Sequence, residues 1–183
     1  MRLPILIPLV LLTSACAASP SDPPPAAPVA KPAYHAPAEG FCKKLDLEAF
    51  AGKYGPLLPI GIFEDQSSGQ IPSHTCQANF SQERSISSGG SVNLLIIVFP
   101  TEEAAIGGYT RTAGLPSAAQ AEAGVSADEV KWTSSADTWQ LVMRDDNAVV
   151  TVKVTSKDSP FDVSLAVPLK ELGNQVLERM RAA

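Results

Sequence analysis

Residues 92–99 read Val-Asn-Leu-Leu-Ile-Ile-Val-Phe and form the most apolar run beyond the N-terminal region. β-branched side chains fill the second half of the run, and Pro100 follows it. The run is too short to cross a membrane, which takes about 20 apolar residues, and its β-branched content favours a strand over a helix. We therefore predict that residues 92–99 form the central strand of a sheet and are covered on both faces.

Other segments of the chain predict further strands by alternating apolar and polar residues. Asp145, Asp146 and Asn147 separate two of these segments, and such residues tolerate the left-handed backbone of a tight turn, which predicts a hairpin. The strands that we expect around residues 92–99 are residues 58–63, 75–82, 130–133, 138–144 and 148–155.

Three helices are expected beside the sheet. Asp46 and Thr101 are suitable N-cap residues, and Pro168 fits the first position of a helix. Gly107 and Gly108 each weaken the second helix by about 1 kcal/mol relative to alanine, and close packing against a strand is one reason to tolerate them. Residues 161–166 fit either a short strand or the beginning of the last helix. The resulting fold class is α+β, a single domain with an antiparallel β-sheet flanked by helices.

The N-terminus has the layout of a secretory signal peptide. Arg2 precedes an apolar run, residues 3–12, and small residues follow up to Cys16. This junction resembles the bacterial lipobox, in which the signal is cut before a diacylated cysteine, although Thr13 stands where leucine is usual. Residues 1–15 are then the signal peptide, and Cys16 carries the lipid. The alternative is a secreted protein whose signal peptide is cleaved elsewhere, for instance after Ala18.

Residues 16–40 are rich in proline, alanine and serine and have little apolar bulk. Such a composition predicts a disordered linker between the lipidated cysteine and a globular domain at residues 41–183. Tyr34 and His35 fall within this linker, and we expect both to be solvated. Apart from the lipid, we expect no contact with the membrane, because no later segment is long and apolar enough to span it.

Charge and cysteine content narrow the function. The 183-residue chain has a formal net charge of -5, which disfavours a nucleic-acid partner. With Cys16 assigned to the lipid, Cys42 and Cys76 form an even pair in an oxidising compartment. We therefore predict a Cys42–Cys76 disulfide, and the alternative is two free buried thiols.

The sequence resembles small two-cysteine lipoproteins of actinobacteria. The features that carry this resemblance are the Cys16 junction, the proline-rich linker, Cys42 before a short helix and the strand with Cys76. Several members of that group are domains of unknown function, and similar lipoproteins have an antiparallel sheet flanked by helices. The family often has tryptophan two positions after its second cysteine, whereas this chain has Ala78. The resemblance implies no catalytic residue.

Few residues of the expected domain suggest chemistry. His74 is its one histidine, and without a Gly-x-Ser-x-Gly motif we expect an exposed loop residue rather than a catalytic base. With both cysteines in a disulfide, we expect no metal site and no cofactor. Asp145, Asp146 and Asn147 fit a turn better than a calcium loop. Trp132 offers a ligand face if it is exposed.

Two functions remain open from the sequence. The first is a non-enzymatic binding or interaction module, lipid-anchored on the extracytoplasmic face of the cell membrane, with an envelope lipid, glycan or protein as its ligand. The second is an envelope hydrolase or transferase whose active site has no recognisable motif. A deep apolar cavity would favour a lipid ligand, and a shallow exposed face would favour a glycan or a protein.

Overall fold

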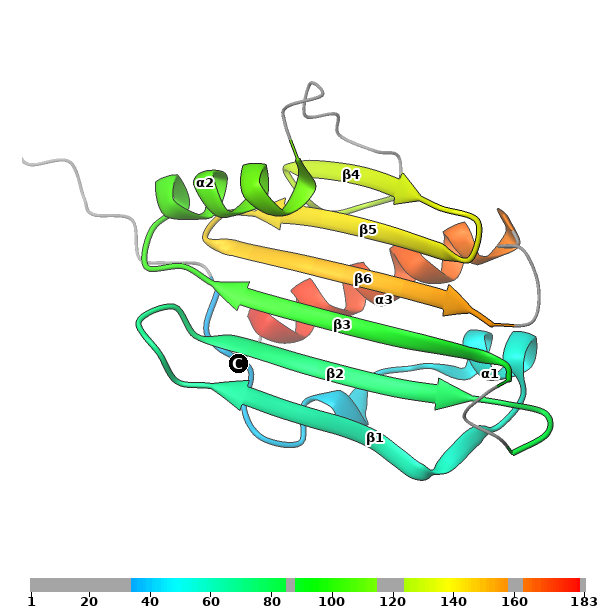
Figure 1. Cartoon of the computed structure of the whole chain (residues 1–183). Helices are drawn as coiled ribbons and strands as arrows, with labels where there is room; N and C mark the ends of the chain where they lie inside the picture. Colours follow the sequence, from blue (N-terminus) through cyan, green and yellow to red (C-terminus); the bar gives the residue numbers. More distant parts are fainter. Residues whose placement is uncertain (1–33, 85–87, 115–123, 158–162, 182–183) are drawn as a thin grey trace, which may run out of the picture. The chain divides into compact units, whose positions relative to one another are not determined.

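The computed structural model describes residues 34–84, 88–114, 124–157 and 163–181, all within one compact unit, Lys31–Ala183. It confirms an α+β domain built on an antiparallel sheet (Figure 1). The predicted signal peptide, Cys16 and most of the predicted linker lie outside the described residues. The elements are η1 (Cys42–Lys44), α1 (Glu48–Tyr54), β1 (Leu57–Ser67), β2 (Ser73–Phe80), β3 (Gly90–Val98), α2 (Glu102–Ala113), β4 (Glu129–Ser134), β5 (Thr138–Asp145), β6 (Ala148–Ser156), η2 (Val163–Leu165) and α3 (Ala166–Arg181).

The sheet joins two three-stranded meanders edge to edge. Its strand order is β1-β2-β3-β6-β5-β4, and every neighbouring pair is antiparallel. β3 and β6 pair at the centre over nine residues, from Gly90 with Ser156 to Val98 with Ala148. The apolar run thus lies in a central strand, as the sequence predicts.

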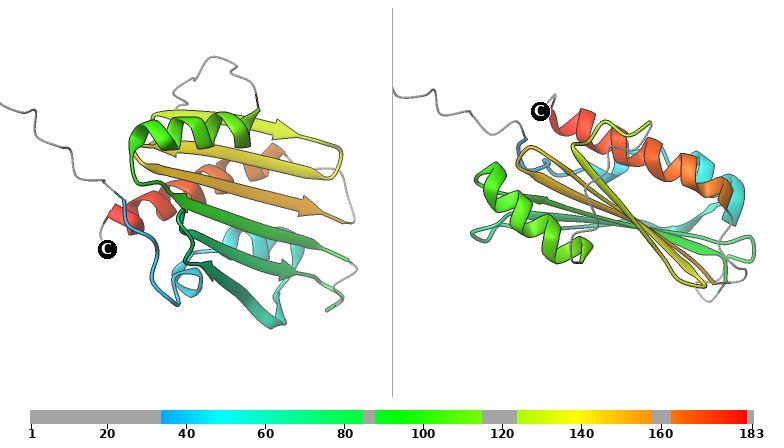
Figure 2. Two further views of the ribbon diagram at one scale, coloured as in Figure 1. Left: turned by 60° about the vertical axis from the view of Figure 1, so that its left-hand side comes forward. Right: turned by 90° about the horizontal axis from the view of Figure 1, so that it is seen from above.

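Helices lie on both faces of the sheet (Figure 2). η1, α1 and α3 lie on one face, which we call the core face, and α2 packs over β5 and β6 on the opposite face. Since α3 also contacts β5 and β6, this half of the sheet is covered on both sides. On the half made of β1, β2 and β3, the described part of the chain places no helix on the α2 side, and we call this surface the open face.

This arrangement corrects the prediction that the central strand is covered on both faces. Side chains of β3 that point to the core face, such as Leu94 and Ile96, are almost fully buried. Leu95 and Ile97 point to the opposite face and are only half-buried. The difference arises because α2 lies over the neighbouring β5 and β6 instead of over β3.

The helix boundaries agree with the sequence in part. The Thr101 hydroxyl accepts a hydrogen bond from the Ala104 amide at 3.2 Å and caps α2 as predicted. The N-cap of α1 is Leu47, and Asp46 instead accepts a bond from the Glu48 amide at 3.0 Å. Residues 163–165 form η2 rather than a strand, so α3 begins at Ala166, and Pro168 is its third residue.

Other elements extend or shift the predicted ranges. β1 continues to Ser67, past the predicted end at residue 63, and β2 runs from Ser73 to Phe80. The predicted hairpin is confirmed, with β5 ending at Asp145, β6 beginning at Ala148 and Asp146 in the left-handed region at φ 48.

The domain begins earlier than residue 41. Tyr34 is 1% exposed, whereas its neighbour His35 is exposed. The Tyr34 backbone exchanges hydrogen bonds with the Asn147 side chain, and the Tyr34 hydroxyl donates to the Asp145 carboxylate. Arg181, at the end of α3, pairs with the same carboxylate and lies 5.3 Å from the centre of the Tyr34 ring. We call this group the Tyr34 clasp; its phenol is therefore buried and not solvated as predicted.

Candidate functional site

The Cys42–Cys76 disulfide is present and lies on the core face between η1 and β2. The two Cα atoms are 5.6 Å apart, well within the range of a disulfide. Alternation along β2 turns Cys76 towards the core, and the 3-10 turn of η1 brings Cys42 over it. Both cysteines are almost fully buried, so the bond fastens the segment before α1 to the sheet, in agreement with the sequence.

His74 is buried, and this overturns the expectation of an exposed loop histidine. The residue lies inside β2, two positions before Cys76 and on the same face, and only 2% of it is exposed. Its Nε2 atom lies 2.7 Å from the Glu64 carboxylate and 3.4 Å from the Cys42 sulfur. The Phe41 ring meets the imidazole edge-on, with ring centres 5.7 Å apart.

Glu64 belongs to this cluster because of strand register. It lies on β1 opposite Cys76, so its side chain points to the core face. The carboxylate also accepts a hydrogen bond from the Phe41 amide at 3.1 Å. The Glu64 carboxylate therefore has two partners, the Phe41 amide and His74 Nε2. Its side chain is 13% exposed, just inside the edge of the sheet. Sequence alternation on β2 could have placed His74 beside Cys76, but nothing in the sequence fixes the register that brings in Glu64.

The open face carries the side chains of β1, β2 and β3 that point away from the core. Strand register aligns Phe63, Gln77, Asn93 and Lys153 in one row across β1, β2, β3 and β6. Phe63 is 63% exposed, and the three polar residues are half-buried. An exposed aromatic ring beside amide and ammonium groups can stack and exchange hydrogen bonds with a polar ligand.

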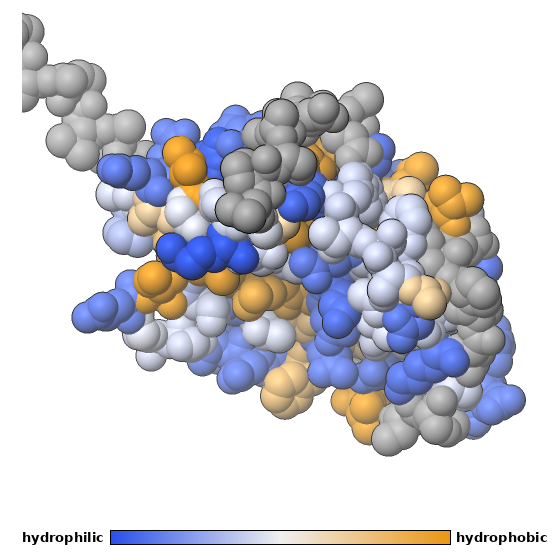
Figure 3. All heavy atoms as spheres, turned by 45° about the horizontal axis from the view of Figure 1, so that its top comes forward, coloured by the Kyte–Doolittle hydropathy of each residue, from blue (hydrophilic) through white to orange (hydrophobic). Residues whose placement is uncertain are grey.

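A shallow groove of about 440 Å³ adjoins this face, between α2 and the β1–β2 loop. Its apolar part is formed by Ile71, Phe99 and Ala104, and Glu103 and Arg111 bring opposite charges. Figure 3 shows apolar patches on this side of the molecule, separated by polar and charged surface. The described surface here is open and mixed in character.

Trp132 is half-buried and does not form the exposed platform that the sequence allowed. It lies on β4 with its side chain on the core face, because it pairs with the buried Leu141. Its ring meets that of Trp139 edge-on, with centres 5.7 Å apart. Both tryptophans are partly buried and pack against the core.

Asp145 and Asn147 lie at the hairpin turn and also contact Tyr34 in the Tyr34 clasp. Asn147 also donates a hydrogen bond to the Phe99 carbonyl at 2.8 Å. Burial raises the pKa of the Tyr34 phenol, and the adjacent Asp145 carboxylate raises this pKa further. The clasp could not be predicted from the sequence, because Tyr34 lies in a proline-rich segment that has no strand or helix pattern.

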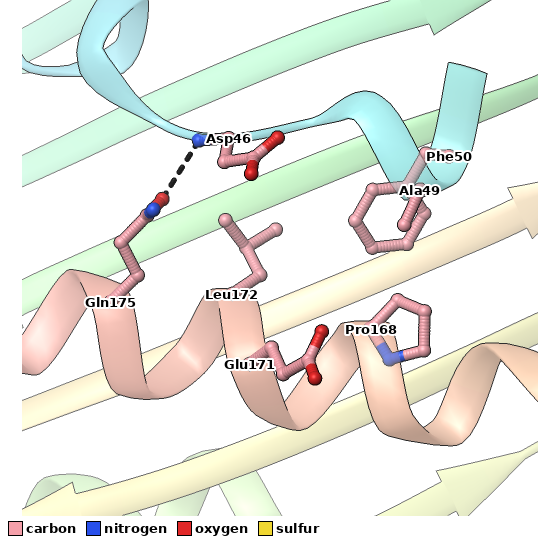
Figure 4. A pocket seen from close by; sticks show the side chains of 7 residues that line it. All are labelled: Asp46, Ala49, Phe50, Pro168, Glu171, Leu172 and Gln175. Carbon is pink, nitrogen blue, oxygen red and sulfur yellow. Dashed lines mark hydrogen bonds between the residues drawn. The ribbon is translucent and has the colours of Figure 1, made fainter. Parts of the chain in front are cut away.

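A small pocket lies between α1 and α3 (Figure 4). Its volume is about 90 Å³, room for about three water molecules at their liquid volume. The Asp46 amide donates to Gln175 at 2.8 Å across it, and the carboxylates of Asp46 and Glu171 lie at its edges. The pocket is too small for an organic ligand of ordinary size.

No protein-family model, curated protein or solved structure matches the chain. Within the described residues, no helix is both long and apolar enough to cross a membrane. The described residues form an α+β domain with a disulfide-linked core face and an open opposite face.

Proposed function

We propose that the chain is a lipid-anchored protein of the extracytoplasmic membrane face and that its domain is a non-enzymatic binding module. Cys16 would carry the lipid, and the domain would bind a glycan or a protein of the cell envelope on the open face. The observation that carries the binding role is the uncovered half of the sheet, where Phe63 lies in a row with polar side chains and a groove opens at the end of the sheet near the β1–β2 loop.

The shape of this surface favours a glycan or a protein over a lipid. Lipid-binding sites enclose apolar chains, whereas the groove beside α2 is shallow and is lined by charged and polar groups as well as Ile71 and Phe99. The apolar pocket next to the disulfide has a volume of about 10 Å³, less than one acyl chain requires.

No observation favours the alternative of a hydrolase or transferase. A serine hydrolase needs a serine hydroxyl beside its histidine. The polar contacts of His74 among the described residues are with Glu64 and the Cys42 sulfur, and neither is an activated serine.

Anchoring is tested by Cys16→Ser. We expect the variant to appear in the medium or to remain unprocessed, because the lipid on Cys16 is the only membrane attachment that we propose for the domain. Membrane fractionation and intact-mass measurement of the N-terminus report the outcome. Full recovery of the processed variant in membranes would argue against lipidation at Cys16.

Binding is tested by placing a photo-crosslinking amino acid at Phe63 in the anchored protein. Glu178, exposed on the outer side of α3, is the matched control position. We expect the Phe63 probe alone to capture one recurrent glycan or protein, identified by mass spectrometry. Capture should fall when Gln77 and Lys153 are both changed to alanine. Equal capture from both positions would contradict the proposed surface, and so would capture that is unchanged in the double-alanine variant.

A further inference from the structure

Three side chains that commonly bind transition metals meet at one point on the core face. The Cys42 sulfur, the Cys76 sulfur and a ring nitrogen of His74 all lie within 4.8 Å of one another. β2 supplies His74 and Cys76 from the same face, and η1 supplies Cys42 from a segment more than 30 residues earlier in the chain. All three residues are buried, so water competes weakly for a bound ion.

One spacing among these atoms already matches that of a tetrahedral zinc site. Zn–N and Zn–S bonds of about 2.0 and 2.3 Å place a nitrogen and a sulfur ligand about 3.5 Å apart. Nε2 of His74 lies 3.4 Å from the Cys42 sulfur. Two changes are needed: the two sulfurs, bonded to each other in the disulfide, must separate, and the Cys76 sulfur, up to 4.8 Å from the His74 ring nitrogen, must move closer to it. Cys42 lies in a short 3-10 turn outside the sheet, so it can move without breaking a strand ladder.

Glu64, which contacts His74, is the candidate for a fourth ligand. Its carboxylate lies 2.7 Å from His74 Nε2, and its backbone pairs with that of Cys76. In a tetrahedral site these two ligand atoms would be about 3.3 Å apart, so the carboxylate must withdraw by about half an ångström. Two sulfurs, one imidazole and one carboxylate are a ligand set that suits Zn²⁺.

We propose that the reduced form of this protein binds one zinc ion through Cys42, Cys76, His74 and Glu64. The disulfide and the zinc site are then alternative states of the same four side chains. This site is separate from the open face, because it lies on the opposite side of the sheet.

The two states interconvert by balanced steps. A dithiol reductant transfers two electrons and two protons to the disulfide, which gives two cysteine thiols and oxidises the reductant to its own disulfide. Zinc then displaces the two thiol protons and binds the thiolates. The His74 ring must carry its proton on Nδ1, since Nε2 faces the other ligands. An oxidised protein has no thiolate and cannot form this site.

The experiment uses the full chain in detergent with Cys16→Ser, so that Cys42 and Cys76 are its only cysteines. The protein is reduced without oxygen and titrated with Co²⁺, which gives a thiolate charge-transfer absorption when it occupies a zinc site. We expect this absorption to saturate at one cobalt per chain, to be displaced by zinc, and to be absent from the oxidised protein. A reduced protein that gives no such absorption overturns the proposal.

Variants separate the proposed ligands from the rest of the chain. His74→Gln should weaken cobalt affinity by at least about 10-fold, as loss of a metal-site group commonly does. His35→Gln, at an exposed position, should leave the affinity unchanged. His74→Cys supplies another metal ligand and should restore binding, which a purely structural role for His74 would not predict. Unchanged affinity in His74→Gln refutes the site, and unchanged affinity in Glu64→Gln refutes the fourth ligand.

Folding provides a second readout. Far-UV circular dichroism of the reduced chain is recorded with and without zinc. Where reduction unfolds the chain, we expect zinc to restore the native spectrum, because binding to the folded state stabilises it. Failure of zinc to restore the spectrum also overturns the proposal.

Discussion

Gly107 and Gly108 are adjacent in α2 but differ in their surroundings, which allows a matched test of how this helix packs. A Cβ atom at Gly108 would overlap the Phe99 ring, with the Cε2 atom only 2.7 Å away. A Cβ atom at Gly107 would meet nothing nearer than a side-chain nitrogen of Arg111 at 3.6 Å. The sequence suggested close packing for both glycines, and the structure shows it for Gly108 alone.

The expected effects follow from two terms. Alanine is favoured over glycine inside a helix by about 1 kcal/mol, and this gain applies to both positions. Gly107→Ala should therefore raise the free energy of unfolding by about 1 kcal/mol. Gly108→Ala has the same gain but adds a methyl group against a buried ring, and such overpacking costs about 1 to 3 kcal/mol. The second variant should thus be less stable than the first by about 1 to 3 kcal/mol.

Urea denaturation at equilibrium measures both variants, and an unchanged m-value shows that the difference lies in stability. Phe99→Leu provides the internal check, because removal of the ring should reduce the penalty at Gly108 and leave the gain at Gly107 intact. Equal stability of the two alanine variants, or a penalty that Phe99→Leu does not reduce, would refute the packing of α2 on Phe99.

Three further predictions concern stability. Replacing Cys42 and Cys76 by alanine in metal-free buffer should cost about 3 to 4 kcal/mol, since the bond closes a loop across a sequence separation of 34; a loss below 1 kcal/mol by urea denaturation would contradict this. Burial and Asp145 raise the pKa of the Tyr34 phenol above its ordinary value of 10.0, so the unfolded chain ionises first and stability falls above about pH 10. Tyr34→Phe should flatten that alkaline decline in pH-dependent melting, and an unchanged slope would argue against the buried phenol. Thr101→Ala removes the N-cap of α2 and should cost about 1 kcal/mol, so a neutral result would show that this cap is dispensable.

The sequence predicted elements whose signal is local. The apolar run at residues 92–99, the hairpin at Asp145 and the Thr101 cap depend on periodicity or on one residue type at one position, and the structure contains all three. The single disulfide was predictable because assigning Cys16 to the lipid left one pair. These features require no knowledge of which strands are neighbours.

The features that the sequence missed depend on contacts between distant segments. His74 is buried because β2 continues through it, and it meets Glu64 because of the β1–β2 register, which no local pattern specifies. Tyr34 is buried through contacts with Asp145 and Asn147, more than 100 residues away in the chain. The open face was missed because periodicity predicts a helix at α2 but not the strands that it covers.

The Tyr34 clasp also determines where mechanical force enters the domain. In a chain anchored at Cys16, tension along the N-terminal segment would reach the described structure at Tyr34, its first residue. The clasp passes the load to Asn147 and Asp145 at the turn between β5 and β6, and to Arg181 at the end of α3. β5 and β6 are inner strands with a neighbour on each side, so the load is shared across the ladder instead of peeling an edge strand away. A partner bound on the open face would instead pull on β1 to β3 directly, and the load would cross the central β3–β6 ladder before it reaches the clasp.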